Sequence, residues 1–120
     1  MQGKYRNKKC FFGGRIYDSK LEAKRAWELE LMERGGRIRG LERQKPFVLQ
    51  EGFVNNKGEK VRAITYVADF YYYDVDEEQL VVEDVKGYAT EVYKIKKKMF
   101  EKRYGDIEFR EIRKPRQERE

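Results

Sequence analysis

The sequence of 120 residues has no histidine, one cysteine and two prolines. Without histidine the chain cannot build a Ser-His-Asp or Cys-His triad, a histidine-ligated metal site, or a histidine acid/base pair. The single cysteine, Cys10, excludes an internal disulfide and a cysteine-rich zinc site, and it is typical of a reducing compartment. Any catalysis must therefore depend on carboxylates, lysines and backbone groups, and any metal that takes part must be a hard one.

Long apolar runs are also missing. The mean hydropathy is −1.00, and no stretch is apolar enough to span a membrane, so we expect no membrane association. No apolar segment follows the basic N-terminus, which argues against a secretory signal and favours a cytoplasmic protein. The length leaves little room for a second core, so we expect one domain.

Charge is plentiful and unevenly placed. Lys and Arg number 28 against 22 Asp and Glu, a net charge of +6. Residues 69–84 nevertheless contain seven acids and no Lys or Arg. The acids at positions 74–78 are typical of a solvated hairpin tip. The strongly basic remainder favours a polyanionic partner, of which nucleic acid is the commonest.

The pattern of apolar, capping and turn residues predicts an α/β domain with a mixed sheet, in the order α-β-β-β-β-α-β. Ser19-Lys20-Leu21-Glu22 matches a capping box, which predicts a helix from about Lys20 to the glycines at 35–36. The other expected elements are strands at 38–41, 47–50, 61–73 and 80–86, a helix at 91–104, and a last strand around 107–109. Pro46 marks a break or an edge. We expect the domain to cover 1–113, with a basic arm or loose hairpin at about 1–17, and a frayed polar tail at 114–120.

Three acids lie where apolar residues are expected. Glu22 falls on the apolar side of the first helix, although the capping box also accounts for it. Asp69 lies inside a strand rich in aromatic and β-branched residues, where aspartate is disfavoured. Asp84 shares one strand face with Val82 and Lys86, while Glu83 points to the other face. The Asp84 and Lys86 pair could be a same-face ion pair, or all three acids could converge on one site.

The two helices also carry charge beside their apolar faces. In the first, Lys24, Arg25 and Glu28 fall on the expected solvent face. In the second, the expected apolar arc consists of Val92, Ile95, Met99, Phe100 and Tyr104. Lys94, Lys97 and Lys98 lie outside this arc, whereas Lys96 lies within it. Lys96 would extend its ammonium to solvent, pair with Glu83, or contact a phosphate.

The ordered motifs resemble those of the PD-(D/E)xK nuclease superfamily, and in particular small phage endonucleases of the Holliday-junction-resolvase type. The matching pieces are Ser19-x-x-Glu22, the segment 66–70 (YVADF), the segment 82–87 (VEDVKG), and the lysine-rich helix followed by YGDI at 104–107. They span about residues 18–112. Ala68 stands where the family usually has proline. The resemblance implies a restriction-endonuclease-like core, a mixed central sheet flanked by two helices, with the active site where the strands carrying Asp69 and Asp84 diverge.

The resemblance also implies roles for individual residues. Asp69, Asp84 and the backbone carbonyl of Val85 would ligate Mg²⁺, with Mn²⁺ as a substitute, and Glu22 would bind the metal or its water. Hard oxygen ligands suit Mg²⁺, and crowded carboxylates need a cation to offset their repulsion. Lys86 would support the attacking water electrostatically, because neighbouring carboxylates keep an ammonium charged. Glu83 has the wrong facing for a ligand, so we expect Glu83→Gln to affect cleavage only mildly in comparison with Asp69→Asn and Asp84→Asn.

The function expected from this resemblance is metal-dependent hydrolysis of phosphodiester bonds in branched or structured DNA. The enzyme would be phage- or prophage-encoded, act in the bacterial cytoplasm, and could form a homodimer as junction resolvases do. The cations expected to contact the DNA backbone are Lys94, Lys96, Lys97, Lys98, Arg37, Arg39 and Arg43. Two alternatives remain: a non-catalytic nucleic-acid-binding module of the same fold, and a phage accessory protein whose basic surface binds an acidic protein.

Overall fold

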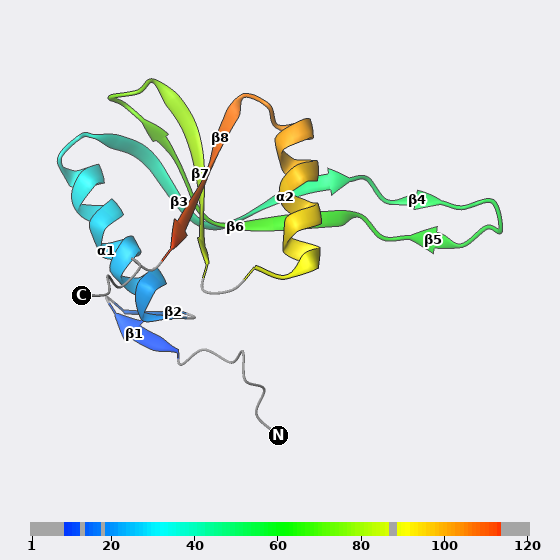
Figure 1. Cartoon of the computed structure of the whole chain (residues 1–120), viewed down its shortest axis with the longest axis horizontal. Coiled ribbons are helices and arrows are strands. Elements are labelled where there is room, and N and C mark those ends of the chain that lie inside the picture. Colours follow the sequence, from blue (N-terminus) through cyan, green and yellow to red (C-terminus); the bar gives the residue numbers. More distant parts are fainter. Residues whose placement is uncertain (1–8, 13, 18, 87–88, 114–120) are drawn as a thin grey trace, which may run out of the picture.

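A computed structural model describes residues 9–12, 14–17, 19–86 and 89–113 (Figure 1). Its centre is a four-stranded sheet in the order β3-β6-β7-β8. The strands are β3 (Ile38–Gln50), β6 (Ile64–Asp74), β7 (Gln79–Lys86) and β8 (Ile107–Arg113). Only the β7–β8 pair is parallel, so the sheet is mixed, as predicted. Most of the expected N-terminal arm, at 1–8, and the expected tail at 114–120 lie outside the described residues.

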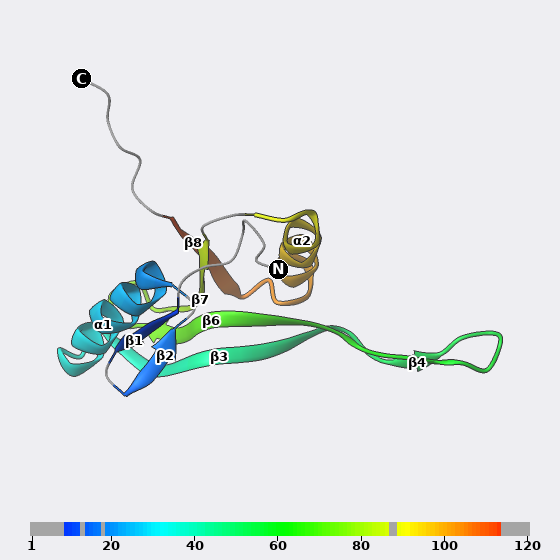
Figure 2. The same cartoon turned by 90° about the horizontal axis from the view of Figure 1, so that it is seen from below.

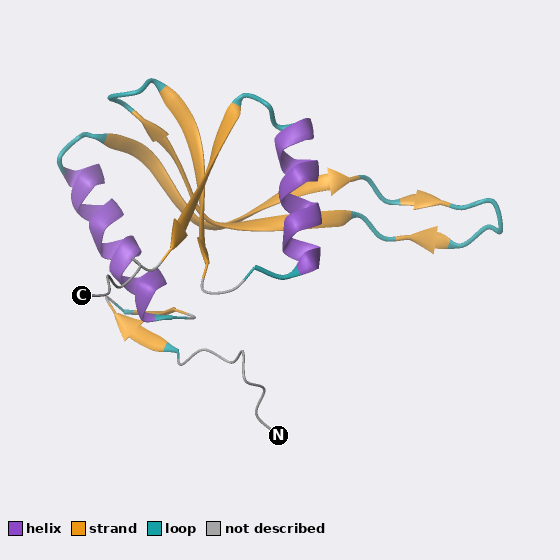
Figure 3. Ribbon diagram, in the orientation of Figure 1, coloured by secondary structure: helices purple, strands orange, loops and turns teal. Residues whose placement is uncertain are grey.

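Helices α1 (Lys20–Arg34) and α2 (Glu91–Arg103) lie on opposite sides of the β7–β8 pair (Figure 3). Both begin where the sequence predicts. The Ser19 hydroxyl accepts a hydrogen bond from the Glu22 amide, and the Thr90 hydroxyl accepts one from the Tyr93 amide. Helix α2 is the crossover that two parallel neighbouring strands require. Neither helix of the described chain is long and apolar enough to cross a membrane.

The segment 38–50 forms one continuous strand instead of the two strands predicted. Pro46 lies within β3 and pairs with Val67. This is tolerated because β3 is an edge strand, where a missing backbone donor breaks no ladder on the open side. The register between β3 and β6 shifts between Arg39 and Glu42, around Gly40, which has a φ of +66°. This bulge lies well before Pro46, where the sequence pattern suggested a break, and the pairing around Pro46 is regular.

Two small hairpins extend the structure. Strands β1 (Cys10–Phe12) and β2 (Arg15–Tyr17) form a hairpin beside α1, which agrees with the expected loose hairpin. Strands β4 (Phe53–Val54) and β5 (Lys60–Val61) continue the β3–β6 pair into a ribbon that projects well beyond the body (Figure 2). The ribbon contributes nothing to the two core clusters, so its contacts with the body end where β3 and β6 leave the core.

The core is divided into two clusters by the alternation of β7. Val81 packs on the α1 side with Ala26, Leu29, Phe70 and Tyr72. The α2 side holds a second cluster with many aromatic rings, consisting of Phe47, Leu49, Tyr66, Ala68, Val82, Tyr93 and Phe100. The predicted facing of Val82 and Asp84 against Val81 and Glu83 is therefore correct. Each of these two acids is buried in a different half of the molecule.

Helix α2 is rotated relative to the predicted apolar arc. Its buried residues are Tyr93 and Phe100, whereas Val92 and Ile95 are 62% and 58% exposed. Tyr93, Phe100 and the C-cap residue Tyr104 all belong to the aromatic cluster, so they set the orientation of the helix. Of the three alternatives for Lys96, the pair with Glu83 is wrong, because Glu83 lies on the far side of β7 and bonds to residues there.

The acidic turn between β6 and β7 is only partly solvated. Asp76, Glu77 and Glu78 are exposed, as expected for a hairpin tip. Asp74 is instead buried, where it accepts a hydrogen bond from the Glu77 amide and forms an ion pair with Arg110 at 3.4 Å. The last strand thus supplies the cation that allows this carboxylate to be buried.

Candidate active site at the fork between two strands

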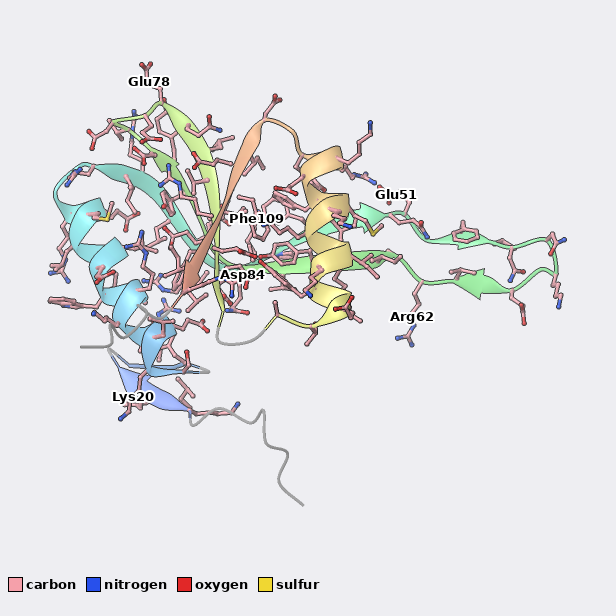
Figure 4. The ribbon with its side chains drawn as sticks, viewed as in Figure 1. Lys20, Glu51, Arg62, Glu78, Asp84 and Phe109 are labelled. Carbon is pink, nitrogen blue, oxygen red and sulfur yellow. The ribbon has the colours of Figure 1, made fainter. Side chains whose placement is uncertain are left out.

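Strands β6 and β7 separate at the point where the two predicted aspartates lie. Their pairing runs from Asp74 and Gln79 to Phe70 and Glu83 and continues no further. Asp69 and Asp84 are the next residues on each strand. The Val85 amide donates to Asp69 Oδ2 at 2.7 Å, so the Asp69 carboxylate closes the fork against the backbone next to Asp84. Asp84 lies near the middle of the molecular body (Figure 4).

Glu22 reaches the same place through a glutamine. It is buried in the first turn of α1. The Nε2 group of Gln44, on β3, donates to Glu22 Oε2 and to Asp69 Oδ1, each at 3.2 Å. A single amide therefore links the helix acid to the strand acid. Sequence reasoning missed Gln44, because only the register of β3 against β6 places it opposite Asp69.

Tyr66 holds Asp84. Its hydroxyl donates to Asp84 Oδ2, and both residues are 4% exposed. Burial raises the pKa of Tyr66 far above its usual value, and the charges of Asp84 and Asp69 add to the effect, so the hydroxyl remains a donor. The sequence contains a signal for this hydrogen bond. A tyrosine buried in a strand usually finds a partner for its hydroxyl, and Tyr66 lies three residues before Asp69.

Glu83, next to Asp84, belongs to a different arrangement. It is completely buried and accepts two hydrogen bonds from Arg25, at 2.7 and 2.6 Å, and one from the Tyr72 hydroxyl at 2.5 Å. The bond to Glu83 is the main reason that the pKa of Arg25 is raised. The expected solvent position of Arg25 is therefore wrong, since its long side chain turns inward to a buried carboxylate.

The predicted lysines of α2 line a second feature, a cleft of about 380 Å³ between α2 and β8. Lys94, Lys97 and Lys98 line it together with Tyr93 and Glu111. Glu111 accepts from the Tyr93 hydroxyl at 2.6 Å and lies 3.5 Å from the Lys97 ammonium. The hydrogen bond from Tyr93 lowers the pKa of Glu111, so this carboxylate stays charged in a cleft where Glu91 and Glu101 also lie among the cations. Lys96 is half-buried.

The arginines predicted to contact DNA differ in how strongly the fold holds them. Arg43 is largely buried and pairs with Glu30 at 2.5 Å. Arg37 pairs with Asp76 at 3.1 Å, with both side chains mostly exposed. Arg39 is exposed and lies over the Tyr73 ring, 5.3 Å from its centroid. Arg37 and Arg39 can therefore reach a polyanion more easily than Arg43 can.

Lys86 is placed only by its backbone. It belongs to β7 and lies opposite Arg113 of β8. Its side chain lies outside what the structure describes. The fork is therefore defined by Glu22, Gln44, Asp69, Asp84 and the Val85 backbone, with Lys86 two residues beyond Asp84 on the same strand.

The donor set fits a hard divalent ion in its chemistry. Within the described residues, no three ligands of the His, Cys, Asp and Glu type are gathered closely enough to form a ready-made metal site. Mg²⁺ needs only one or two carboxylates, because water and substrate phosphate complete its coordination. Asp69 and Asp84 meet that requirement, and Glu22 is held near them through Gln44.

An opening lies beside these groups. Glu22, Gln44 and Arg43 line a cleft of about 260 Å³ together with Arg15, Ile16 and Tyr17 from the N-terminal hairpin. Two guanidinium groups therefore flank the side of Glu22 and Gln44 that faces the solvent. An anionic group such as a phosphate that enters this cleft would therefore meet positive charge as well as the carboxylates.

Comparison with known proteins places the chain in a family. No curated protein and no solved structure matches the chain significantly. The profile of a family described as a protein of unknown function, DUF1064, matches residues 2–118. Because this match covers nearly the whole chain, the protein belongs to the DUF1064 family.

Proposed function

We propose that this protein is a divalent-metal-dependent endonuclease that hydrolyses phosphodiester bonds of DNA. One observation carries the proposal: Asp69 and Asp84 lie where β6 and β7 part, and a hydrogen bond joins Asp69 to the backbone next to Asp84. The motif resemblance predicts this location for the active site. Glu22, the third acid of the resemblance, is linked to Asp69 through one amide.

The chain's own groups have separate tasks in the proposed reaction. Asp69 and Asp84 hold Mg²⁺ or Mn²⁺, together with the Val85 carbonyl, and Glu22 binds the metal or its water. The chemistry that such an ion supplies is a bound water of lowered pKa and neutralisation of the phosphate charge. Tyr66 fixes the orientation of Asp84 through its hydroxyl. The motif resemblance assigns to Lys86 the supply of positive charge to the reaction.

The basic surface supports a DNA substrate. Lys94 and Lys98 are exposed along the cleft between α2 and β8, and Arg37 and Arg39 are accessible at the start of β3. Such contacts bind the phosphate backbone without reading sequence. The resemblance to phage junction endonucleases adds three further parts of the proposal: branched DNA as substrate, a phage or prophage origin with action in the bacterial cytoplasm, and a homodimer.

A cleavage assay tests the proposal. Purified protein is incubated with four-way junction, flap, nicked and linear duplex DNA and with RNA, in Mg²⁺, Mn²⁺ or chelator. We expect cleavage only with metal. Asp69→Asn and Asp84→Asn should each lower the single-turnover rate by about 1,000-fold or more, roughly 4 kcal/mol, while binding the substrate at least as tightly. Glu78→Gln, at the exposed tip, is the control and should cleave normally.

Two outcomes would overturn the proposal. Tight binding of DNA without cleavage under any of these conditions would favour the non-catalytic module. Absence of DNA binding at low salt would favour the acidic protein partner.

A further inference from the structure

Gln44 has an unusual backbone for its place in the fold. Its φ is +51°, in the left-handed region that residues other than glycine rarely adopt. The neighbours on either side pair regularly with β6, Arg43 with Phe70 and Lys45 with Ala68. Among the residues of β3 other than glycine, a positive φ occurs only at Gln44, which lies opposite Asp69. Backbone strain of this kind persists only where surrounding interactions enforce it, and it clusters at functional sites.

The hydrogen bonds of the Gln44 side chain suggest a reason for this backbone conformation. The two hydrogens of the Gln44 amide go to two different carboxylates, Glu22 and Asp69. Gln44 itself is exposed, so core packing does not account for its position. Two carboxylates near one another repel. A neutral donor between them offsets that repulsion and fixes the spacing of the two acids.

We propose that Gln44 is a positioning residue for a divalent cation, and this inference rests on the proposed metal-dependent function. Its amide holds Glu22 and Asp69 together in the ion-free protein, so that little rearrangement is left when a hard cation binds near them. Preorganisation of this type increases affinity because the cost of ordering the ligands is met during folding.

Two substitutions separate this role from a purely structural one. Gln44→Asn keeps an amide and tolerates a positive φ well, but it is one methylene shorter and cannot reach both acids. Gln44→Glu keeps the length and replaces the donor by a third negative charge. A matched control is Gln50→Glu, an exposed glutamine at the far end of the same strand.

The measurements use the full chain without DNA. Mn²⁺ binding is followed by titration calorimetry, and the melting temperature is recorded in chelator and in saturating Mn²⁺. We expect Gln44→Asn to weaken Mn²⁺ binding about tenfold, because the acids are no longer held together. We expect Gln44→Glu to melt below the wild type in chelator and to gain more than the wild type from Mn²⁺, since added ligand charge strengthens cation binding. The Gln50→Glu control should match the wild type in Mn²⁺ affinity.

Each outcome supports or overturns a specific claim. If both Gln44 variants bind Mn²⁺ as the wild type does, or lose the same stability with and without Mn²⁺, Gln44 is not a positioning residue, while cleavage by the wild type would leave the endonuclease proposal intact. If the wild type binds Mn²⁺ and the variants behave as expected but no nucleic acid is cleaved, only the endonuclease proposal fails. If the wild type binds no Mn²⁺ in the absence of DNA, the inference about Gln44 is wrong, and the cleavage assay alone decides the endonuclease proposal.

Discussion

Glu83 and Asp84 are adjacent residues on one strand and are both almost fully buried, yet they have different hydrogen-bond partners on the two sides of β7. On the α1 side, Glu83 receives three hydrogen bonds, two of them from the guanidinium of Arg25. On the α2 side, Asp84 accepts from the neutral Tyr66 hydroxyl and lies at the open end of the fork beside Asp69. The difference follows from strand alternation alone, which turns neighbouring side chains to opposite faces.

This comparison separates an acid that serves the fold from one that is suited to chemistry. A buried carboxylate is tolerated when a paired cation and further hydrogen bonds replace its lost hydration. Around Glu83, the Arg25 guanidinium supplies the cation and two hydrogen bonds, and the Tyr72 phenol supplies a third hydrogen bond. At the fork, Asp69 and Asp84 occupy the first unpaired positions of two neighbouring strands. A bound cation would offset the repulsion between two carboxylates placed there.

The largest expected effect that tests this difference is on folding. Glu83→Gln should lower the free energy of unfolding by about 3 kcal/mol, because it removes the fully buried charge that pairs with Arg25 and leaves the guanidinium only its more exposed partner Glu28. Urea denaturation followed by circular dichroism measures the change. The sequence-based expectation for Glu83→Gln concerned cleavage alone, which this variant should affect only mildly when folded. Asp84→Asn, its neighbour, should cost clearly less stability while removing cleavage.

Arg25→Met is the companion variant. It removes both hydrogen bonds from Arg25 and leaves the buried Glu83 carboxylate the one from Tyr72. A loss of stability of similar size is therefore expected. A stability change below about 1 kcal/mol in both variants, the range of a surface ion pair, would show that Glu83 does not hold the α1 side together. The proposed contrast between the two acids would then be wrong.

The second effect compares the two tyrosines that serve these acids. A hydrogen bond to a charged group contributes about 1.5–3 kcal/mol. Tyr72→Phe removes the donor to Glu83 and should lower stability by that amount without changing the cleavage rate of folded protein. Tyr66→Phe removes the donor to Asp84 and should also slow single-turnover cleavage by about tenfold, or 1.4 kcal/mol. Equal rates for the two variants would contradict a special role for Tyr66.

The sequence predicted those parts of the site that depend on local rules. The capping residues Ser19 and Thr90 located both helices, and alternation along β7 gave the correct facing of Glu83 and Asp84. These features need only a few consecutive residues. The position of Asp69 and Asp84 at a common fork came from the motif resemblance, and the strand register of the structure agrees with it.

The remaining features of the site depend on contacts between residues that are far apart in the sequence. Gln44 faces Asp69 only because β3 runs without interruption past a bulge, and a pattern that split β3 at Pro46 could not align the two. Arg25 was assigned to solvent because a helical wheel records the direction of Cβ and ignores the reach of a long side chain. Helix α2 was predicted about one residue out of rotation, since the aromatic rings that orient it come from β3, β6 and β8.

The smallest expected effect is one that both sides of β7 share, and it appears at high pH. Burial raises the pKa of Tyr66 and of Tyr72 well above the usual value near 10, and the neighbouring acid adds to the shift in each case. In the unfolded chain both ionise near pH 10, whereas in the fold both stay protonated. The stability linked to each group is therefore complete below about pH 10 and is lost as the pH rises. Between pH 10 and 11 each tyrosine should lower the free energy of unfolding by about 1 kcal/mol.

The variants already described test this linkage and with it the comparison. Tyr72→Phe and Tyr66→Phe should each be less stable than the wild type at pH 8, yet each should lose less stability between pH 10 and 11, because one ionising group has been removed. Urea denaturation at half-unit pH steps gives the slopes. Lysines and arginines on the surface contribute equally to all three proteins, so the difference between slopes isolates the tyrosine. Parallel curves would mean that these hydroxyls ionise as readily in the fold as in the unfolded chain. A shallower slope for only one variant would show that only one of the two sides of β7 keeps its phenol in the protonated form.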